Sequence, residues 1–245
     1  MPQPSPHVPE EQSESRITTT TTATVDSPEM SKTPSLTLIL AATPSLGIGK
    51  NGTLPWPQLK KEMGFFARVT KRTSPASESA TTRKINAVIM GSKTWTSIPP
   101  KFRPLKDRLN VIITRDPKSF QDKLKDEPKS VEGPLICSGI LDALSKLQDT
   151  AAIGDGAEID RVFVIGGASI YQTALELPQT SRVLLTKIHK EYDCDTFFSV
   201  NLDETTFWKE KSREEVQAFT GEEISEIGIE EQGVRFEFCM YEKAE

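Results

Sequence analysis

The segment Val162-Phe163-Val164-Ile165-Gly166-Gly167-Ala168-Ser169 contains the transition on which the fold of this chain depends. Its first four residues are apolar, and three of them are β-branched, which is typical of a strand buried on both faces. The two glycines allow a tight turn and a close approach of backbone to a ligand, and a helical pattern follows them. The segment therefore predicts a strand–turn–helix unit that binds phosphate, although a Gly-Gly turn at a strand end also has a purely steric explanation.

Short apolar runs and helical patterns alternate on both sides of this unit. This alternation predicts an α/β domain with a mainly parallel sheet, and the alternating Phe236, Phe238 and Met240 near the end predict an antiparallel C-terminal strand. The predicted strands are Leu36–Ala42, Ala87–Met90, Leu109–Thr114, Leu135–Cys137, Val162–Ile165, Val183–Ile188 and Val234–Tyr241, and the predicted helices are Pro57–Thr70, Lys93–Ser97, Leu141–Gln148 and Ser169–Leu177.

A glycine pattern near the first strand imitates a dinucleotide-binding fingerprint. Gly47-Ile48-Gly49-Lys50-Asn51-Gly52 matches GxGxxG, and that motif requires a helix to begin at its third glycine. Pro55 and Pro57 prevent such a helix. We therefore expect a mobile glycine-rich loop that carries Leu54 and Trp56 and closes over a pocket.

The helix predicted over Pro57–Thr70, with Pro57 in its first turn, places a carboxylate on an apolar face. At 100° per residue, Leu59, Met63 and Phe66 share one stripe, and Glu62 lies within it. A carboxylate there is costly unless it is paired, and it suits a ligand that presents two adjacent N–H donors. The alternative is a Glu62 at the edge of the stripe that extends toward a lysine or arginine.

Polar side chains follow two further strands. Thr114 and Arg115 come after Leu109–Ile113 and would suit a phosphomonoester such as a 2′-phosphate, and Lys93 and Thr94 occupy the same position after Gly91. A solvated arginine is the simpler explanation of Arg115 taken alone. His189 lies in a polar setting, and no group of residues has metal-ligand spacing, so no metal site is expected.

Composition excludes several classes of protein. The 245 residues carry a formal net charge of −5, of which −3 lies in residues 1–35, so the rest is close to neutral and a basic nucleic-acid-binding surface is not expected. The longest apolar run, Leu36–Ala42, is far shorter than the ~20 residues that a bilayer requires, and no secretory or transit signal is visible. Cys137, Cys194 and Cys239 form no CxxC pair, which favours a reducing, cytoplasmic setting without disulfides.

The organisation of the chain follows from the same composition. Residues 1–35, with six prolines and a threonine run, are expected to be a disordered tail before a domain at 36–245, and Met30 is a candidate for the true start of translation. The polar stretches Thr73–Lys84, Asp116–Gly133, Thr150–Asp160 and Arg213–Gly233 are expected to be surface insertions.

Taken together, the motifs closely resemble dihydrofolate reductases of the eukaryotic type. The resemblance extends in order from about Leu36 to Tyr241, and the polar stretches interrupt it only between motifs. It rests on Gly47–Pro57, on Glu62 with Phe65-Phe66, on Val88–Trp95, Ser97–Pro99, Arg103–Arg108, Val164–Gly167, Ser169–Tyr171, Leu185-Thr186 and Asp195–Phe198. It implies a single domain with a central eight-stranded, mostly parallel sheet, an antiparallel C-terminal strand and flanking helices.

The resemblance also implies an activity, namely NADPH-dependent reduction of 7,8-dihydrofolate to tetrahydrofolate for one-carbon and thymidylate metabolism. Hydride would pass from nicotinamide C4 to pterin C6, with protonation of N5 assisted through water by Glu62, the family's catalytic carboxylate. Thr186 would bond that carboxylate and Trp56 would order the water. A cytoplasmic monomer that binds dihydrofolate and antifolate inhibitors, but no nucleic acid or membrane, is the corresponding expectation.

Binding residues follow from the same resemblance. The implied substrate contacts are Ile39, Ala41, Leu54, Glu62, Met63, Phe66, Ile98, Pro99, Leu105, Ile165, Tyr171 and Thr186, with Arg108 for the α-carboxylate of the glutamate tail. The implied cofactor contacts are Ala41, Ile48, Gly49, Lys93, Thr94, Thr114, Arg115, Ser138, Gly139, Gly166, Gly167, Ala168, Ser169, Ile170 and Tyr171, with a cis peptide between Gly166 and Gly167.

Two positions depart from the family pattern, and two other kinds of protein are less consistent with the motifs. Met63 replaces an aromatic residue of some relatives, and Ser92 replaces a basic residue beside the 2′-phosphate, so NADPH selection would depend on Arg115 and Lys93. A reductase of the riboflavin pathway shares the fold, but its substrate has neither a pterin edge for Glu62 nor a glutamate tail for Arg108. A catalytically silent binding protein has no reason to retain Trp56, Glu62 and Thr186 together.

Overall fold

Parallel strands form the centre of the sheet, as the alternation predicts. In the computed structural model the strand order is β10-β11-β7-β1-β6-β3-β4-β5, and β9 pairs with β11 outside this path. The pairs among β7, β1, β6, β3, β4 and β5 are parallel, whereas β11 runs antiparallel to β7. The predicted eight-stranded, mostly parallel sheet is therefore confirmed along this path, and β9 is a ninth strand joined to it through β11. Its strands are β1 (Leu36–Ala42), β3 (Lys84–Gly91), β4 (Arg108–Ile113), β5 (Leu135–Cys137), β6 (Glu158–Val164), β7 (Thr180–Ile188), β9 (Trp208–Glu210), β10 (Ile229–Glu231) and β11 (Val234–Lys243).

The structure describes residues 1–3, 34–75, 82–125, 130–149 and 157–244. Residues 33–245 group into one unit by their contacts. The expectations of a disordered tail and of a start at Met30 fall on residues outside the described ranges. Within those ranges, no helix is long and apolar enough to cross a bilayer.

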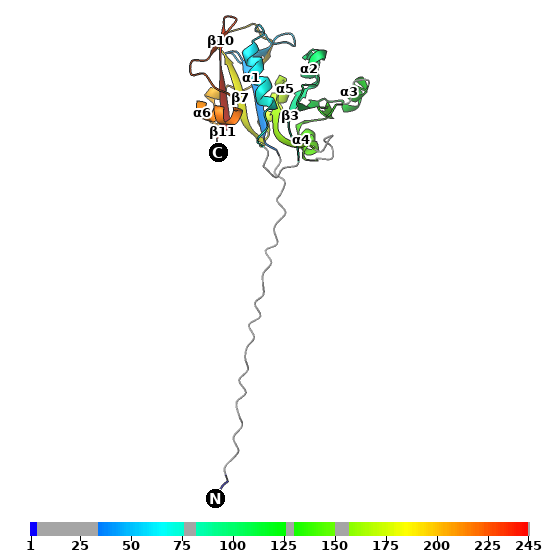
Figure 1. Cartoon of the computed structure of the whole chain (residues 1–245), viewed down its shortest axis with the longest axis vertical. Coiled ribbons are helices and arrows are strands. Elements are labelled where there is room, and N and C mark those ends of the chain that lie inside the picture. The colour runs from blue at the N-terminus through cyan, green and yellow to red at the C-terminus, as the bar shows by residue number, and fades with distance from the viewer. Residues whose placement is uncertain (4–33, 76–81, 126–129, 150–156, 245) are drawn as a thin grey trace. The chain divides into compact units, whose positions relative to one another are not determined.

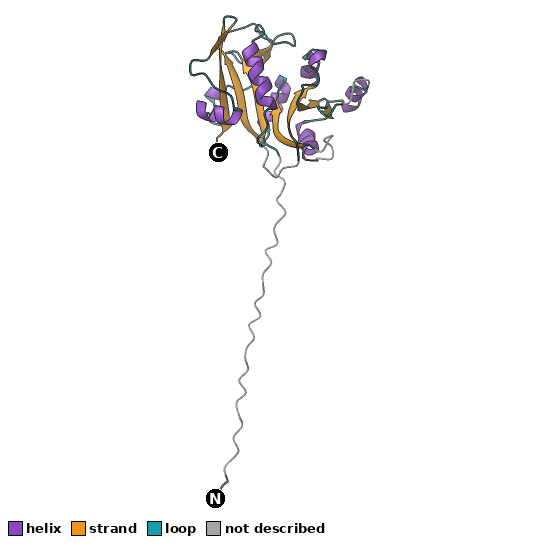
Figure 2. Cartoon of the chain, in the orientation of Figure 1, coloured by secondary structure: helices purple, strands orange, loops and turns teal. Residues whose placement is uncertain are grey.

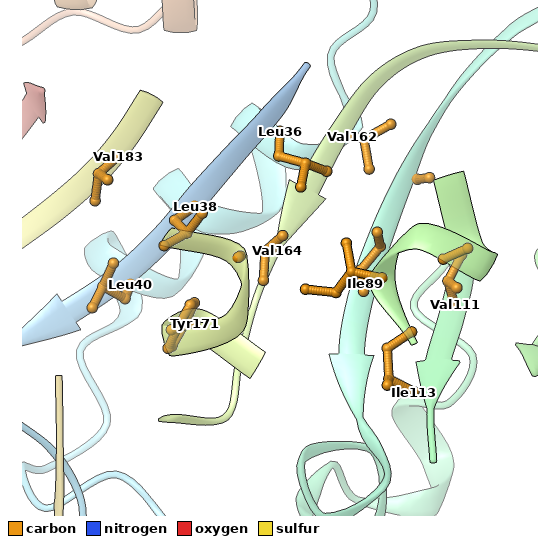
Figure 3. Packing of buried hydrophobic residues seen from close by; sticks show 14 of the residues in the cluster. Leu36, Leu38, Leu40, Ile89, Val111, Ile113, Val162, Val164, Tyr171 and Val183 are labelled. Atoms are coloured by element: carbon orange, nitrogen blue, oxygen red, sulfur yellow. The ribbon is translucent and has the colours of Figure 1, made fainter. Parts of the chain in front are cut away.

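Alternating side chains of the central strands fill the two faces of the sheet. Leu36, Leu38 and Leu40 of β1 belong to one buried cluster, whereas Ile39 belongs to the other. The first cluster is closed by helices α4 (Ile140–Gln148) and α5 (Ala168–Glu176), and the second by α1 (Lys60–Lys71). Figure 3 shows side chains of the first cluster, in which Tyr171 of α5 joins residues of the central strands.

Short helices and a small sheet complete the fold, and Figures 1 and 2 show how they surround the strands. The predicted helices at 93–97, 141–148 and 169–177 are confirmed to within one residue at each end. The remaining elements are β2 (Gly47–Gly49), which pairs with β8 (Thr196–Phe197), the helices α2 (Ser92–Ser97), α3 (Pro117–Lys123) and α6 (Arg213–Thr220), and the 3₁₀ turns Pro100–Phe102 and Leu202–Glu204.

Helix α1 begins later than predicted. Pro57 does not lie in its first turn, because the chain stays extended through Leu59, which supplies no side-chain cap. The cap comes from Glu231, whose carboxylate accepts hydrogen bonds from the N–H groups of Lys60 and Lys61 at 3.0 and 2.9 Å. Glu231 is distant in sequence, so local signals could not place this helix start.

The buried face of α1 also differs from the predicted stripe. The helix buries Phe65 and Val69, whereas Met63 is 43% exposed. Phe65 stacks on Phe238 of β11 with ring centroids 3.7 Å apart, and this contact orients the helix on the sheet. The stripe of Leu59, Met63 and Phe66 was therefore wrong at Met63, because tertiary packing decides which face is covered.

The polar stretches are only partly surface insertions. The end of the first stretch, residue 84, belongs to β3, and the end of the third, residues 158–160, belongs to β6. The second stretch, 116–133, includes α3. The stretch 213–233 contains α6, which begins with a capping box between Ser212 and Glu215, and it buries Val216 and Ile224. The expectation of a surface insertion was therefore wrong for this last stretch. Cys137, Cys194 and Cys239 are free thiols, as predicted.

Candidate active site

The carboxyl ends of neighbouring parallel strands bring the predicted site residues to one edge of the sheet. Strands β6, β3, β4 and β5 are adjacent and parallel, so the residues that follow each of them lie along the same edge. Ligands of open α/β sheets bind at this edge. The predicted residues there are Gly166–Ile170 after β6, Lys93 and Thr94 after β3, Thr114 and Arg115 after β4, and Ser138 and Gly139 after β5.

Glu62 lies in the first turn of α1 and faces β7. The hydroxyl of Thr186 donates a hydrogen bond to Glu62 Oε1 at 3.4 Å, and Thr186 itself is buried. Burial raises the pKa of Glu62 to about 7, and the Thr186 bond opposes this shift. Glu62 forms no ion pair with any residue that the structure describes, so the alternative of a carboxylate extending toward a lysine or arginine is not what the structure shows. A buried carboxyl group that titrates near neutrality is suited to proton transfer.

Trp56 lies in the loop before α1 and is buried. Its ring meets Tyr192 edge-on, with centroids 6.2 Å apart. Its Nε1 donor has no hydrogen-bond partner among the described residues. A buried indole N–H of this kind is able to bind a water molecule or a ligand.

The loop before Trp56 forms no helix at its glycines, as the prolines predicted. Gly47–Gly49 is a strand, and Lys50 and Thr53 close a turn. Asp195 holds the loop by accepting from the Asn51 N–H at 2.7 Å and by donating its own N–H to the carbonyl of Gly49 at 3.0 Å. The GxGxxG match is therefore a strand and turn, and closure of this loop over a pocket stays a prediction.

Arg108 is a buried cation at the other end of α1. It is 4% exposed, and its Nη1 donates to Thr70 Oγ1 at 2.8 Å while its Nε donates to the carbonyl of Lys106 at 3.0 Å. Burial lowers its pKa to about 10, although the charges of Asp107 and Glu132 oppose this. It forms no ion pair with the carboxylates that the structure describes. A buried guanidinium in this state is suited to an anionic ligand group.

Trp56 belongs to a large apolar cluster on one face of the sheet. Six of the predicted substrate contacts pack into the same cluster, namely Ile39, Ala41, Phe66, Ile98, Leu105 and Ile165. Leu54, Met63 and Pro99 are exposed instead. Tyr171 belongs to the opposite cluster, and its hydroxyl donates to the carbonyl of Ile39 at 2.8 Å, so that hydroxyl already has a partner.

The Gly166–Gly167 turn fits a phosphate. The peptide between the two glycines is cis, as the resemblance implied, and α5 begins directly after it without a side-chain cap. A Cβ atom on Gly167 would lie 3.3 Å from Thr94 Oγ1, and one on Gly91 would lie 3.2 Å from Ile170 Cγ1. Backbone N–H groups at an uncapped helix start attract an anion, so these residues suit a dinucleotide pyrophosphate.

A cavity of about 290 Å³ lies between α2 and α3. It includes Lys93 and Thr114, both predicted, and also Lys123 of α3, which sequence reasoning left in an insertion. Arg115 is exposed. The hydroxyl and N–H of Ser138 both bond the carboxylate of Asp142. Ile48 packs against the first cluster, and Gly49 lies in β2.

Sequence reasoning missed Thr70 and Glu231. Thr70 is the partner of Arg108, and no local pattern marks it, because the pair joins α1 to β4. Glu231 lies in the stretch 213–233, which the sequence predicts to be a surface insertion. An acidic residue at a hairpin tip carries no signal until the fold shows what it faces.

Comparisons with known proteins agree with this geometry. The family model described as dihydrofolate reductase matches residues 35–228. The dihydrofolate reductase of Pneumocystis carinii is 37% identical over 215 residues, which span 86% of this chain and 98% of that protein. That of Sus scrofa is 37% identical over 209 residues, 85% of this chain and 97% of that protein.

The solved structures include a similar fold. Schistosoma mansoni dihydrofolate reductase superposes with a TM-score of 0.62 at 30% identity and covers 86% of this chain and 99% of its own. The family model's match includes the helix that carries Glu62 and the Gly166–Gly167 turn. The chain therefore belongs to the dihydrofolate reductase family and is an enzyme of that family.

Proposed function

We propose that this enzyme reduces 7,8-dihydrofolate to tetrahydrofolate with NADPH, in support of one-carbon and thymidylate metabolism. The observation that carries the proposal is the placement of Glu62 and Arg108 at opposite ends of α1. Glu62 and Thr70, the partner of Arg108, are eight residues apart, or about 12 Å along the helix axis. A ligand with a pterin at one end and a glutamate carboxylate at the other suits two polar groups that lie at opposite ends of this helix.

Glu62 is proposed as the catalytic carboxylate. Its two oxygens suit the ring N–H and the 2-amino group of a pterin, which form adjacent donors. With a pKa of about 7, the group is partly protonated at neutral pH and is able to assist delivery of a proton to N5 through water. Thr186 orients the carboxylate, and the buried, unpartnered Nε1 of Trp56 is the donor proposed to order that water.

The apolar wall around Trp56 is proposed to hold the pterin and benzoyl rings. Ile39, Phe66, Ile98 and Ile165 belong to it, and the exposed Leu54, Met63 and Pro99 lie at positions where a bound substrate would cover them. Exclusion of water by this wall strengthens the electrostatic interactions of Glu62. Arg108, fixed by Thr70, is proposed to bind the α-carboxylate of the glutamate tail.

The residues at the carboxyl edge fit NADPH. When bound, NADPH supplies the hydride that the pterin receives at C6. Gly166–Ile170 would hold the pyrophosphate, Ala41, Ile48 and Gly49 would contact the nicotinamide end, and Ser138 and Gly139 the adenine end. Lys93, Thr94, Thr114 and Arg115 would bind the 2′-phosphate, and Lys93 and Thr114 share one cavity. Positive charge there favours NADPH over NADH.

One copy of the chain contains every residue of the proposed site, which supports a monomer. The proposed location is the cytoplasm, since the free cysteines suit a reducing compartment. Antifolates that carry the donor pattern of the pterin would bind at Glu62.

The test is NADPH absorbance in the presence of dihydrofolate. We expect consumption of NADPH that depends on dihydrofolate and produces tetrahydrofolate. A folded enzyme that consumes no NADPH under these conditions would overturn the proposal.

A further inference from the structure

The hairpin formed by β10 and β11 holds the helix that carries Glu62. Gln232 and Gly233 connect the two strands, and both have positive φ, 53° and 69°, as in a type I′ turn. The turn is therefore tight, and it fixes Glu231 and Val234 as the last paired residues. A short, well-defined connection gives the Glu231 side chain a defined direction.

Three hydrogen bonds join the tip of this hairpin to the start of α1. Glu231 Oε1 and Oε2 accept from the N–H groups of Lys60 and Lys61, at 3.0 and 2.9 Å, and Gln232 Nε2 donates to the carbonyl of Gln58 at 2.9 Å. Both carboxylate oxygens are used, one on each of two successive donors. The first turn of α1 is thus held by a bidentate carboxylate from another part of the chain, because Leu59 has no capping side chain.

The same hairpin reaches the next turn of α1. Phe238 of β11 stacks on Phe65, and Phe238 pairs in register with Thr186 of β7. Thr186 is the residue that bonds Glu62. The hairpin therefore contacts α1 on both sides of Glu62 and adjoins its hydrogen-bond partner.

We propose that Glu231 is a positioning residue for the catalytic carboxylate, and this rests on the proposed function of Glu62. By satisfying the N–H groups of Lys60 and Lys61, Glu231 keeps the first turn of α1 folded, which holds Glu62 against Thr186. Its carboxylate also neutralises part of the positive dipole at the start of α1. The helix start therefore stabilises the ionised form of Glu62 less than it would without Glu231.

The groups that face Glu62 are few. Thr186 of β7 bonds it, and the buried Tyr171 of α5 has its pKa raised by burial and by the charge of Glu62. No cation pairs with Glu62 among the described residues. Loss of the Glu231 charge would free two N–H groups in the turn that contains Glu62 and admit water there. Both effects favour the ionised form and lower the pKa of Glu62, whereas loosening of the Thr186 bond would raise it. Glu231→Gln removes the charge but keeps one capping oxygen, so it separates the charge effect from that loosening.

The experiment compares Glu231→Gln and Glu231→Ala in the full chain, with Glu230→Gln as the matched control. Glu230 precedes Glu231 in the same strand and is exposed. The first readout is the pH profile of kcat/KM for dihydrofolate. The second is a ¹³C NMR titration of labelled glutamate carboxyls, in which the Glu62 signal is assigned by its absence in Glu62→Gln.

We expect Glu231→Gln to lower the pKa of Glu62 by roughly half a pH unit, as is usual for charge at a helix end. Glu231→Ala, which removes the cap as well, should lower kcat more than it raises KM, and Glu230→Gln should match the wild-type protein. A pKa of Glu62 that is unchanged in Glu231→Gln, with or without a lower Tm, would overturn the proposal. If the wild-type protein has no activity, the proposed function fails, and the NMR titration still decides whether Glu231 acts on Glu62.

Discussion

The hydroxyl of Thr186 lies 3.4 Å from Glu62 Oε1 and is the only hydrogen-bond donor that opposes burial in setting the pKa of that carboxyl among the described residues. The two residues come from β7 and α1, which are 124 positions apart in sequence. Their meeting places a carboxyl group with a pKa of about 7 beside an apolar wall. Such a group exchanges a proton easily at neutral pH, and the first two predictions follow from it.

Replacement of Glu62 by glutamine should reduce kcat/KM for dihydrofolate by at least ~10²-fold, the range usual for acid–base groups. Glutamine preserves the shape of the side chain but has no titratable proton and presents an N–H₂ donor to the pterin donors. Steady-state NADPH consumption measures the loss, and circular dichroism verifies folding. A nearly unchanged rate would remove Glu62 from its proposed role.

Replacement of Thr186 by valine should raise the pKa of Glu62, because the bond that is lost favours the ionised form. The decline of kcat/KM at high pH should then move upward by roughly half a pH unit. Thr186→Ser, which retains the hydroxyl, is the control and should keep the wild-type profile. Identical profiles for valine and serine would show that the hydroxyl does not tune Glu62.

The sequence was sufficient for the order of the main elements, because buried parallel strands are continuous apolar runs. It was insufficient where a residue distant in sequence determines where a helix or strand begins. Helix α1 begins at Lys60 because Glu231 caps it, and β3 extends to residues that include the buried Asn86, whose amide donates to the carbonyls of Thr70 and Arg72. A buried polar residue of this kind suggests a loop from the sequence alone, because its hydrogen-bond partners are not visible there.

The candidate site was also only partly predictable from the sequence. Glu62 stood out because a carboxylate on an apolar face is costly, and the Gly-Gly turn because it follows a strand. The burial of Arg108 and its bond to Thr70 depend on α1 packing beside the start of β4, which no spacing in the sequence records. Met63 was placed on the wrong face because the stack of Phe65 on Phe238 sets the rotation of the helix.

Burial of Glu62 should also make stability depend on pH. Its pKa is about 7 in the folded protein against 4.5 for the free side chain, a difference worth roughly 3 kcal/mol. Below pH 4.5 the group is protonated in both states, and as pH rises through 7 the folded state resists an ionisation that the unfolded state undergoes. The free energy of unfolding should therefore fall across this range by an amount that Glu62→Gln abolishes.

Urea denaturation of the two proteins between pH 4.5 and 8 tests this expectation. Glu230→Gln, which changes an exposed carboxylate, should follow the wild-type curve. A difference between wild type and Glu62→Gln that stays constant with pH would contradict it.

Arg108 should be needed for the glutamate tail and not for the pterin. Arg108→Lys keeps a charge but loses the planar fork that reaches Thr70 and a carboxylate together. We expect KM for dihydrofolate to rise at least ~10-fold, with little change for a dihydropterin that lacks the glutamate. Equal losses for the two substrates would place the tail elsewhere.

Arg115 and Lys93 should discriminate between the two nicotinamide cofactors. Both follow strands at the carboxyl edge, where Lys93 lines the cavity between α2 and α3 and Arg115 is exposed. Because Ser92 contributes no charge, removal of either cation should weaken NADPH binding by roughly 10-fold and leave NADH binding nearly unchanged. Fluorescence titration with each cofactor measures this, and Lys118→Ala, an exposed lysine of α3 outside the cavity lining, is the control. Equal weakening of NADPH and NADH would mean that these cations act on the pyrophosphate, and the 2′-phosphate would then lie against other residues.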